Sequence, residues 1–84
     1  MTAYLKKERV LKTRVFQLWG ENYKGDSKMV RLAQAMGISL AHLYRVRRGD
    51  RKITATFIVG AAKALPGYKL DELFYVSEEA ISHE

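Results

Sequence analysis

The fold is decided by residues 28–48, KMVRLAQAMGISLAHLYRVRR, in which a glycine separates two stretches of helical pattern. The first stretch ends at Gly37, and glycine just after a helix readily adopts the left-handed conformation that turns the chain. Ser39 then offers a side-chain oxygen that caps the start of a second helix. The small residue Ala33, one turn before the glycine, allows the two helices to cross closely at a steep angle. The stretch therefore predicts a helix-turn-helix.

The second of these helices, about residues 40–48, has two different faces. Leu43 and Val46 are three residues apart and are predicted to anchor the helix in the core. The opposite face, spaced i, i+3, i+4 and i+7, points outward and comprises Ala41, Tyr44, Arg45 and Arg48. An arginine-rich face of this kind has no evident part in folding, which indicates an external partner.

The rest of the chain is also predicted to be helical, which gives an all-α fold of about five short helices. Hydrophobic spacing and capping residues place the helices at 4–19, 28–36, 40–48, 55–65 and 70–75. Asp26 or Ser27 is expected to cap the helix over 28–36, and Thr54 the helix over 55–65. The expected core residues in the last four helices include Val30, Ala33, Leu43, Val46, Phe57, Ile58, Ala61, Ala62, Leu65, Leu70, Leu73 and Phe74. A loop is predicted at 20–26.

Length limits the chain to one domain, because 84 residues leave no room for a second core. We expect an N-terminal extension over 1–10, a DNA-binding domain over 11–76 and a flexible tail over 77–84. The chain has no cysteine and no apolar run of the ~18 residues that a membrane span needs. A signal peptide is not evident, so a cytoplasmic protein, bacterial or phage and associated with the nucleoid, is expected.

The charge is unevenly distributed along the chain. Residues 1–52 carry a net charge of +9, whereas residues 53–84 carry −3. A basic half joined to a mildly acidic tail indicates a polyanionic partner on one side of the molecule. Charge alone leaves open a nucleic acid, an anionic membrane surface or an acidic protein.

The pattern from Leu32 to Gly49 resembles a known family. Leu32-Ala33-Gln34-Ala35-Met36-Gly37-Ile38-Ser39, followed by Leu43, Val46 and Gly49, is similar to the helix-turn-helix of the Cro and phage-repressor-like family. The resemblance continues through Lys52, Ala62 and Leu65 to Leu70-Asp71-Glu72-Leu73-Phe74, over roughly residues 11–75. It implies a five-helix domain that places its second motif helix in the major groove, usually as a homodimer on a two-fold operator.

Carried over by position, the resemblance separates two sets of DNA contacts. The base-reading set is Leu40, Ala41, Tyr44 and Arg45. Arg45 suits guanine, whose O6 and N7 atoms accept a bidentate pair, and the apolar members suit a thymine methyl. The remaining set, expected to lie near phosphates, is Lys28, Ser39, His42, Arg47, Arg48, Arg51 and Lys52.

Two positions and one loop depart from the family pattern. Arg47 stands where the family often has glutamate, and Ile53 stands where it often has proline. The loop over 20–26 is longer than the tight connection common in the family. Arg47 makes the surface more basic, and the longer loop leaves room for different partner contacts.

No enzymatic motif is evident, because the sequence lacks a glycine-rich phosphate loop and a histidine paired with a nucleophile. We expect no enzyme activity, no cofactor, no metal and no small-molecule ligand. The expected partners are double-stranded DNA and a second copy of the chain. The alternative is an antitoxin-like or other protein-interaction module that contacts a partner protein through 1–10 and 77–84, with DNA binding secondary.

Overall fold

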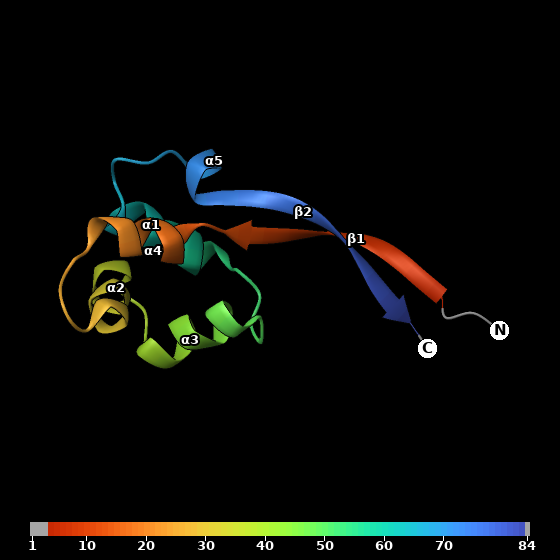
Figure 1. The fold of residues 1–84 in the computed structure, drawn as a ribbon, viewed down its shortest axis with the longest axis horizontal. Helices are drawn as coiled ribbons and strands as arrows, with labels where there is room; N and C mark the ends of the chain where they lie inside the picture. The colour runs from red at the N-terminus through yellow and green to blue at the C-terminus, as the bar shows by residue number, and fades with distance from the viewer. Residues whose placement is uncertain (1–3, 84) are drawn as a thin grey trace.

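The computed structural model describes the backbone of residues 4–83 and the side chains of residues 7–79. It consists of a helical globule and a two-stranded ribbon that projects from one side (Figure 1). In chain order the elements are β1 (Tyr4–Thr13), α1 (Val15–Asn22), α2 (Lys28–Met36), α3 (Leu40–Arg48), α4 (Ala55–Ala64), α5 (Leu70–Leu73) and β2 (Phe74–His83). The projecting ribbon makes the molecule 52 Å long but only 25 Å and 22 Å across. The fold is a mixed α/β one, and the all-α prediction is wrong.

The ribbon pairs the two ends of the described chain. β1 lies antiparallel to β2, in a register that runs from Tyr4 opposite His83 to Thr13 opposite Phe74. The predicted helix over 4–19 is therefore wrong for residues 4–13, and the segment 77–83, expected as a solvated tail, is part of a strand. The pattern of one segment cannot reveal this pairing, because each strand is stabilised by hydrogen bonds to a partner strand more than sixty residues away in the sequence.

The core lies in the globule and is centred on Phe57. Its ring packs near those of Phe16 and Phe74, with centroids 6.3 Å and 6.2 Å away. The buried apolar residues are Val15, Leu32, Ala33, Met36, Leu43, Val46, Phe57, Ala61, Leu65, Leu73 and Phe74. Three residues that we expected there, Val30, Ala62 and Leu70, are exposed instead.

The helices themselves account for two of these errors, those at Val30 and Leu70. α2 turns Leu32, Ala33 and Met36 inward, so Val30 falls on the opposite side of the helix. α5 is a single turn that ends at Leu73 rather than at residue 75, which buries Leu73 and leaves Leu70 in solvent.

A close approach between α2 and α4 holds the globule together. A Cβ atom added at Gly60 of α4 would lie 2.6 Å from the carbonyl oxygen of Met36 in α2. Only glycine fits this contact without a shift of one helix. We expected the small residue Ala33 to allow the crossing of α2 and α3, but we did not predict the close approach of α2 and α4 at Gly60.

Several predicted helix ends are confirmed. The Ser39 hydroxyl accepts a hydrogen bond from the backbone N–H of His42 at 3.0 Å, and the Thr54 hydroxyl accepts one from Phe57 at 3.5 Å. Gly37 ends α2 with a φ of 73°, in the left-handed region. The predicted cap at the start of α2 is wrong, since Ser27 occupies the N-cap position without a side-chain hydrogen bond.

The root of the ribbon is fixed to the globule through one carbonyl. The Leu73 oxygen accepts hydrogen bonds from the backbone N–H of Arg14 at 2.8 Å and from the Thr13 hydroxyl at 3.0 Å. The same hydroxyl oxygen accepts a bond from the backbone N–H of Val15 at 3.1 Å. Both strands therefore leave the globule at one point.

Candidate nucleic-acid interface

The α2–turn–α3 unit has the geometry of a helix-turn-helix. The chain leaves α2 through Gly37, and the backbone N–H of Ile38 returns to the Ala33 carbonyl at 3.1 Å. The Ile38 side chain packs against the core, and the capped N-terminus of α3 follows at once. The turn is thus fixed on both sides by hydrogen bonds and by an apolar anchor.

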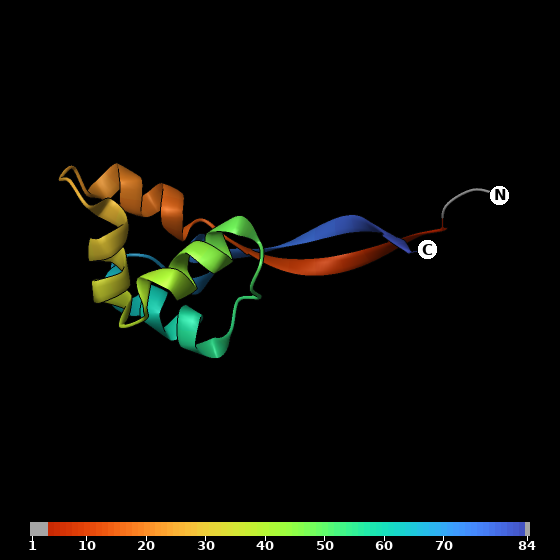
Figure 2. The same cartoon turned by 90° about the horizontal axis from the view of Figure 1, so that it is seen from below.

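α3 is buried along one face and uncovered along the other. Leu43 and Val46 belong to the core, with 0% and 8% exposure. No other helix or strand lies over the outer side of α3 in two perpendicular views (Figure 1, Figure 2). The predicted base-reading residues are all exposed and share this part of the surface, namely Leu40, Ala41, Tyr44 and Arg45. Leu40, three residues before the buried Leu43, is 36% exposed.

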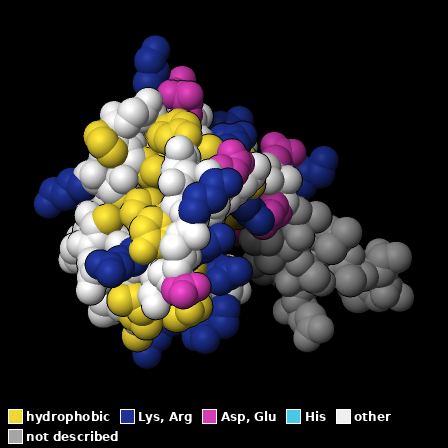
Figure 3. Space-filling view, turned by 60° about the vertical axis from the view of Figure 1, so that its left-hand side comes forward, with side chains coloured by type: hydrophobic (Ala, Val, Ile, Leu, Met, Phe, Trp, Pro, Cys, Tyr) yellow, Lys and Arg dark blue, Asp and Glu magenta, His cyan; other side chains and the backbone are white. Residues whose placement is uncertain are grey.

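The cations predicted to contact phosphates surround this helix. Lys28 opens α2, Arg47 and Arg48 end α3, and Arg51 and Lys52 lie in the segment that leads to α4. All five are exposed, and Lys and Arg side chains gather along the lower edge of the globule, where α3 lies (Figure 3).

Arg48 is the member of this set that is already paired. Its Nε atom donates to the Asp50 carboxylate at 3.0 Å, and both side chains are 62% exposed. Cations in the last turn of α3 also interact favourably with the helix dipole, so part of this charge stabilises the helix itself. The pairing leaves Arg45 as the arginine on the outer face of α3 that has no carboxylate partner among the described residues.

Ser39 and His42 each make a contact within the domain. The Ser39 hydroxyl oxygen is the N-cap acceptor, so its own proton remains available for an outside acceptor. His42 is half-buried, its ring 6.3 Å from that of Phe57, and its buried Nε2 atom has no hydrogen-bond partner among the described residues. Burial lowers the pKa of the His42 imidazole, and the nearby Arg51 and Arg45 lower it further. His42 is therefore only partly accessible, and its contact with a phosphate stays a prediction.

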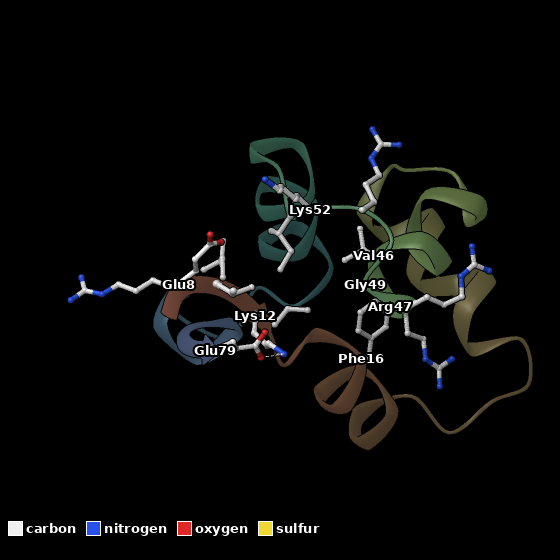
Figure 4. Close-up of a pocket in the computed structure, with 15 residues that line it drawn as sticks. Glu8, Lys12, Phe16, Val46, Arg47, Gly49, Lys52 and Glu79 are labelled. Carbon is white, nitrogen blue, oxygen red and sulfur yellow. Dashed lines mark ion pairs between the residues drawn. The ribbon is translucent and has the colours of Figure 1, made fainter. Parts of the chain in front are cut away.

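A cleft of about 620 Å³ opens between the root of the ribbon and the C-terminal end of α3 (Figure 4). Apolar side chains, including Phe16, Val46 and Ile53, line part of it. Its cations come from both sides, namely Arg9, Lys12, Arg47, Arg48, Arg51 and Lys52. Lys12 is paired with the carboxylate of Glu79, which raises the pKa of the lysine. Sequence reasoning missed the ribbon side of this cleft, because only the pairing of β1 with β2 brings it there.

Comparisons with protein-family models, with curated proteins and with solved structures found no match. Within residues 4–83, no helix is long and apolar enough to cross a membrane. The same part of the chain contains no group of three or more side chains suited to holding a metal ion. The case for a function therefore depends on the geometry of α2, α3 and their surroundings.

Proposed function

We propose that this chain binds double-stranded DNA in a sequence-specific way by inserting α3 into the major groove, and that it acts as a small transcriptional regulator. A repressor or the control protein of a mobile element is the kind of regulator that we propose. The observation that carries the proposal is the uncovered outer face of α3, which places Ala41, Tyr44 and Arg45 together in solvent.

The shape of α3 supports this proposal. A helix with its side chains is about 10–12 Å across, which matches the roughly 12 Å width of the major groove. α3 is short and fixed at both ends, by the Ser39 cap and by the left-handed Gly49 with a φ of 83°. Nothing on its outer side blocks the approach of a duplex (Figure 2).

The side chains on this face suit base edges. Arg45 offers two parallel N–H donors to guanine O6 and N7, a contact that discriminates between bases by about 1–3 kcal/mol. Leu40 and Ala41 offer apolar surface suited to a thymine methyl group. Tyr44, 38% exposed, combines apolar surface with a hydroxyl that can donate or accept.

The surrounding cations suit the phosphate backbone. Lys28 is the first residue of α2, Arg47 lies in the last turn of α3, and Arg51 and Lys52 follow α3 in the chain. We also propose that the protein binds as a homodimer. If about five cations per subunit meet phosphates, log affinity falls against log salt with a slope of about −9 for the dimer.

Selection from a randomised pool of duplex DNA, followed by sequencing of the bound fraction, tests the proposal. We expect an enriched two-fold motif, whose half-sites are separated by about one helical turn or a multiple of it. Absence of enrichment, together with binding that disappears at moderate salt, would indicate nonspecific contact and would overturn the proposal. An Arg51→Ala variant should weaken binding to all sequences about equally and reduce the salt slope by about 1 per subunit.

A protein-interaction module, with DNA binding secondary, is the second candidate. The ribbon favours it, because Leu11, Tyr75 and Val76 expose apolar surface away from α3. That candidate predicts no enriched motif in the selection and no effect of Arg45→Ala on the partner complex. The selection from randomised DNA, carried out with the wild-type chain, therefore distinguishes the two functions.

A further inference from the structure

The ribbon projects from the globule without support along most of its length. Its ten residue pairs extend from the root at Thr13 and Phe74 to Tyr4 and His83 (Figure 1, Figure 2). In the described part beyond the root, residues 7–12 and 75–79, no side chain is buried. A two-stranded ribbon alone is marginally stable in water, and both of its edges present unpaired backbone groups. A ribbon of this length is therefore expected to gain support from a partner.

The two faces of the ribbon differ in what covers them. Residues directly opposite in the register lie on the same face, so Lys12 and Tyr75 share one face. On that face the Arg14 guanidinium lies 4.2 Å from the centre of the Tyr75 ring, and Lys12 is held by Glu79. The side chains of Lys12 and Tyr75 on this face therefore already have contacts within the chain.

The other face carries an apolar pair with little cover. Leu11 lies opposite Val76, and the two side chains are 39% and 64% exposed. Phe74 continues this face into the core at the root. Further out, Arg9 lies opposite Glu78, whose carboxylate also makes a 3.9 Å ion pair with Lys7. An apolar centre flanked by paired charges is the composition of a protein contact.

The charge of the ribbon argues against a nucleic acid as its occupant. The two strands together contain four cations, Lys6, Lys7, Arg9 and Lys12, and three carboxylates, Glu8, Glu78 and Glu79, so their charges nearly balance. β2 as a whole contains no lysine or arginine. The ribbon side of the adjoining cleft carries the cations of Arg9 and Lys12, so a second copy of acidic β2 is complementary to that side.

We propose that two copies of this chain associate through their ribbons, with a two-fold axis beside the Leu11–Val76 pair. An isologous contact brings identical residues together around the axis, so two copies of each side chain form one apolar cluster. The outer half of each ribbon then lies along the root and cleft of the other copy. This inference deepens the dimeric regulator proposed above, but it can be tested without DNA.

The arrangement also suits the orientation of α3. With an axis perpendicular to the ribbon, and parallel to the direction that α3 faces, the two globules lie on either side of the axis and the two-fold rotation leaves that direction unchanged (Figure 2). Both α3 helices then face the same side of the dimer. One duplex can contact both helices only if they share a side.

The oligomeric state of the full chain without DNA provides the test, with a matched pair of variants. Val76→Lys places a charge at the proposed axis, and Val59→Lys places one at a valine of similar exposure, 56%, on α4. We expect wild type and Val59→Lys to be dimers by analytical ultracentrifugation. The dimer dissociation constant of Val76→Lys should be at least about tenfold higher than that of wild type. A wild-type monomer at all concentrations, or a larger loss with Val59→Lys, would overturn the inference.

Cysteine substitution keeps the test decisive if Val76→Lys disturbs the ribbon itself. The chain has no cysteine, so each single-cysteine variant reports one position. Strands that pack face to face lie about 10 Å apart, a separation that a short bismaleimide cross-linker spans at the proposed axis. Val76→Cys should form a covalent dimer with this cross-linker, whereas Val59→Cys should not. Failure of Val76→Cys to cross-link would overturn the inference, whether or not a DNA motif has been found.

Discussion

The helical globule and the ribbon are stabilised in different ways. The globule holds all the buried apolar residues of the described chain, from Val15 to Phe74. The ribbon beyond its root has backbone pairing and two exposed ion pairs, Lys7–Glu78 and Lys12–Glu79, which stabilise a fold little. The globule therefore has the core that an independent domain needs, whereas the ribbon depends on what it is attached to and what it meets.

The largest effect that this comparison predicts concerns the centre of the globule. Phe57 is fully buried and contacts other aromatic rings, so Phe57→Ala should lower the free energy of unfolding by about 3–5 kcal/mol. Urea denaturation followed by circular dichroism measures the loss. Thr56→Ala, on the exposed side of the same helix, is the control and should change the value by less than about 0.5 kcal/mol. A loss below about 1 kcal/mol for Phe57→Ala would show that the core lies elsewhere.

A matched pair of glycine substitutions should act in opposite directions within the globule. Gly60→Ala forces a Cβ against the Met36 carbonyl and should cost about 1–3 kcal/mol. Gly20→Ala places a methyl group in open space in the middle of α1, where alanine favours the helix, and should add up to about 1 kcal/mol. The same denaturation measurement compares the two. Equal effects would mean that α2 and α4 do not approach as closely as described.

The ribbon should open more easily than the helices. Backbone amides of β1 and β2 should exchange with solvent at least about tenfold faster than those of α2 and α4, because the ribbon can open without unfolding the core. Hydrogen exchange measured residue by residue provides the test. Protection of the ribbon should rise with protein concentration if the ribbon joins two copies. Equal protection in both regions at low concentration would contradict the distinction.

The smallest effect should be a pH dependence of the free energy of unfolding, caused by a residue in the globule. The pKa of His42 is lowered in the folded state, chiefly by burial, so the unfolded chain binds a proton more readily. The contribution of His42 to stability is therefore full above its unfolded pKa, near 6.5, and is lost as pH falls through the folded pKa. Unfolding free energies from about pH 7.5 down to about pH 5.5 should fall more for wild type than for His42→Leu. Parallel curves would exclude His42 as the cause.

The globule and the ribbon also differ in how well the sequence predicts them. Capping by Ser39 and Thr54, the left-handed Gly37 and the buried pair Leu43–Val46 depend on neighbours within a few residues, and local pattern predicted them all. The Gly60–Met36 contact and the β1–β2 pairing join distant segments, and both were missed. A strand exposed on both faces also lacks the apolar alternation that usually reveals it.

The candidate site shows the same division. The exposed positions of Leu40, Ala41, Tyr44 and Arg45 follow from the periodicity of one helix. The half-buried position of His42 could not be predicted in this way, because it depends on Phe57 in another helix. The cleft beside the ribbon requires β1, β2 and the end of α3 to be placed together.

The central claim is that Arg45 on α3 reads a base, and selection of wild type and Arg45→Ala from the same randomised DNA pool tests it most directly. We predict that both proteins enrich a related two-fold motif, and that the variant loses preference at one base pair in each half-site by about 5- to 150-fold, the equivalent of about 1–3 kcal/mol. A motif unchanged by Arg45→Ala, or a loss of affinity equal for all sequences, would contradict the claim.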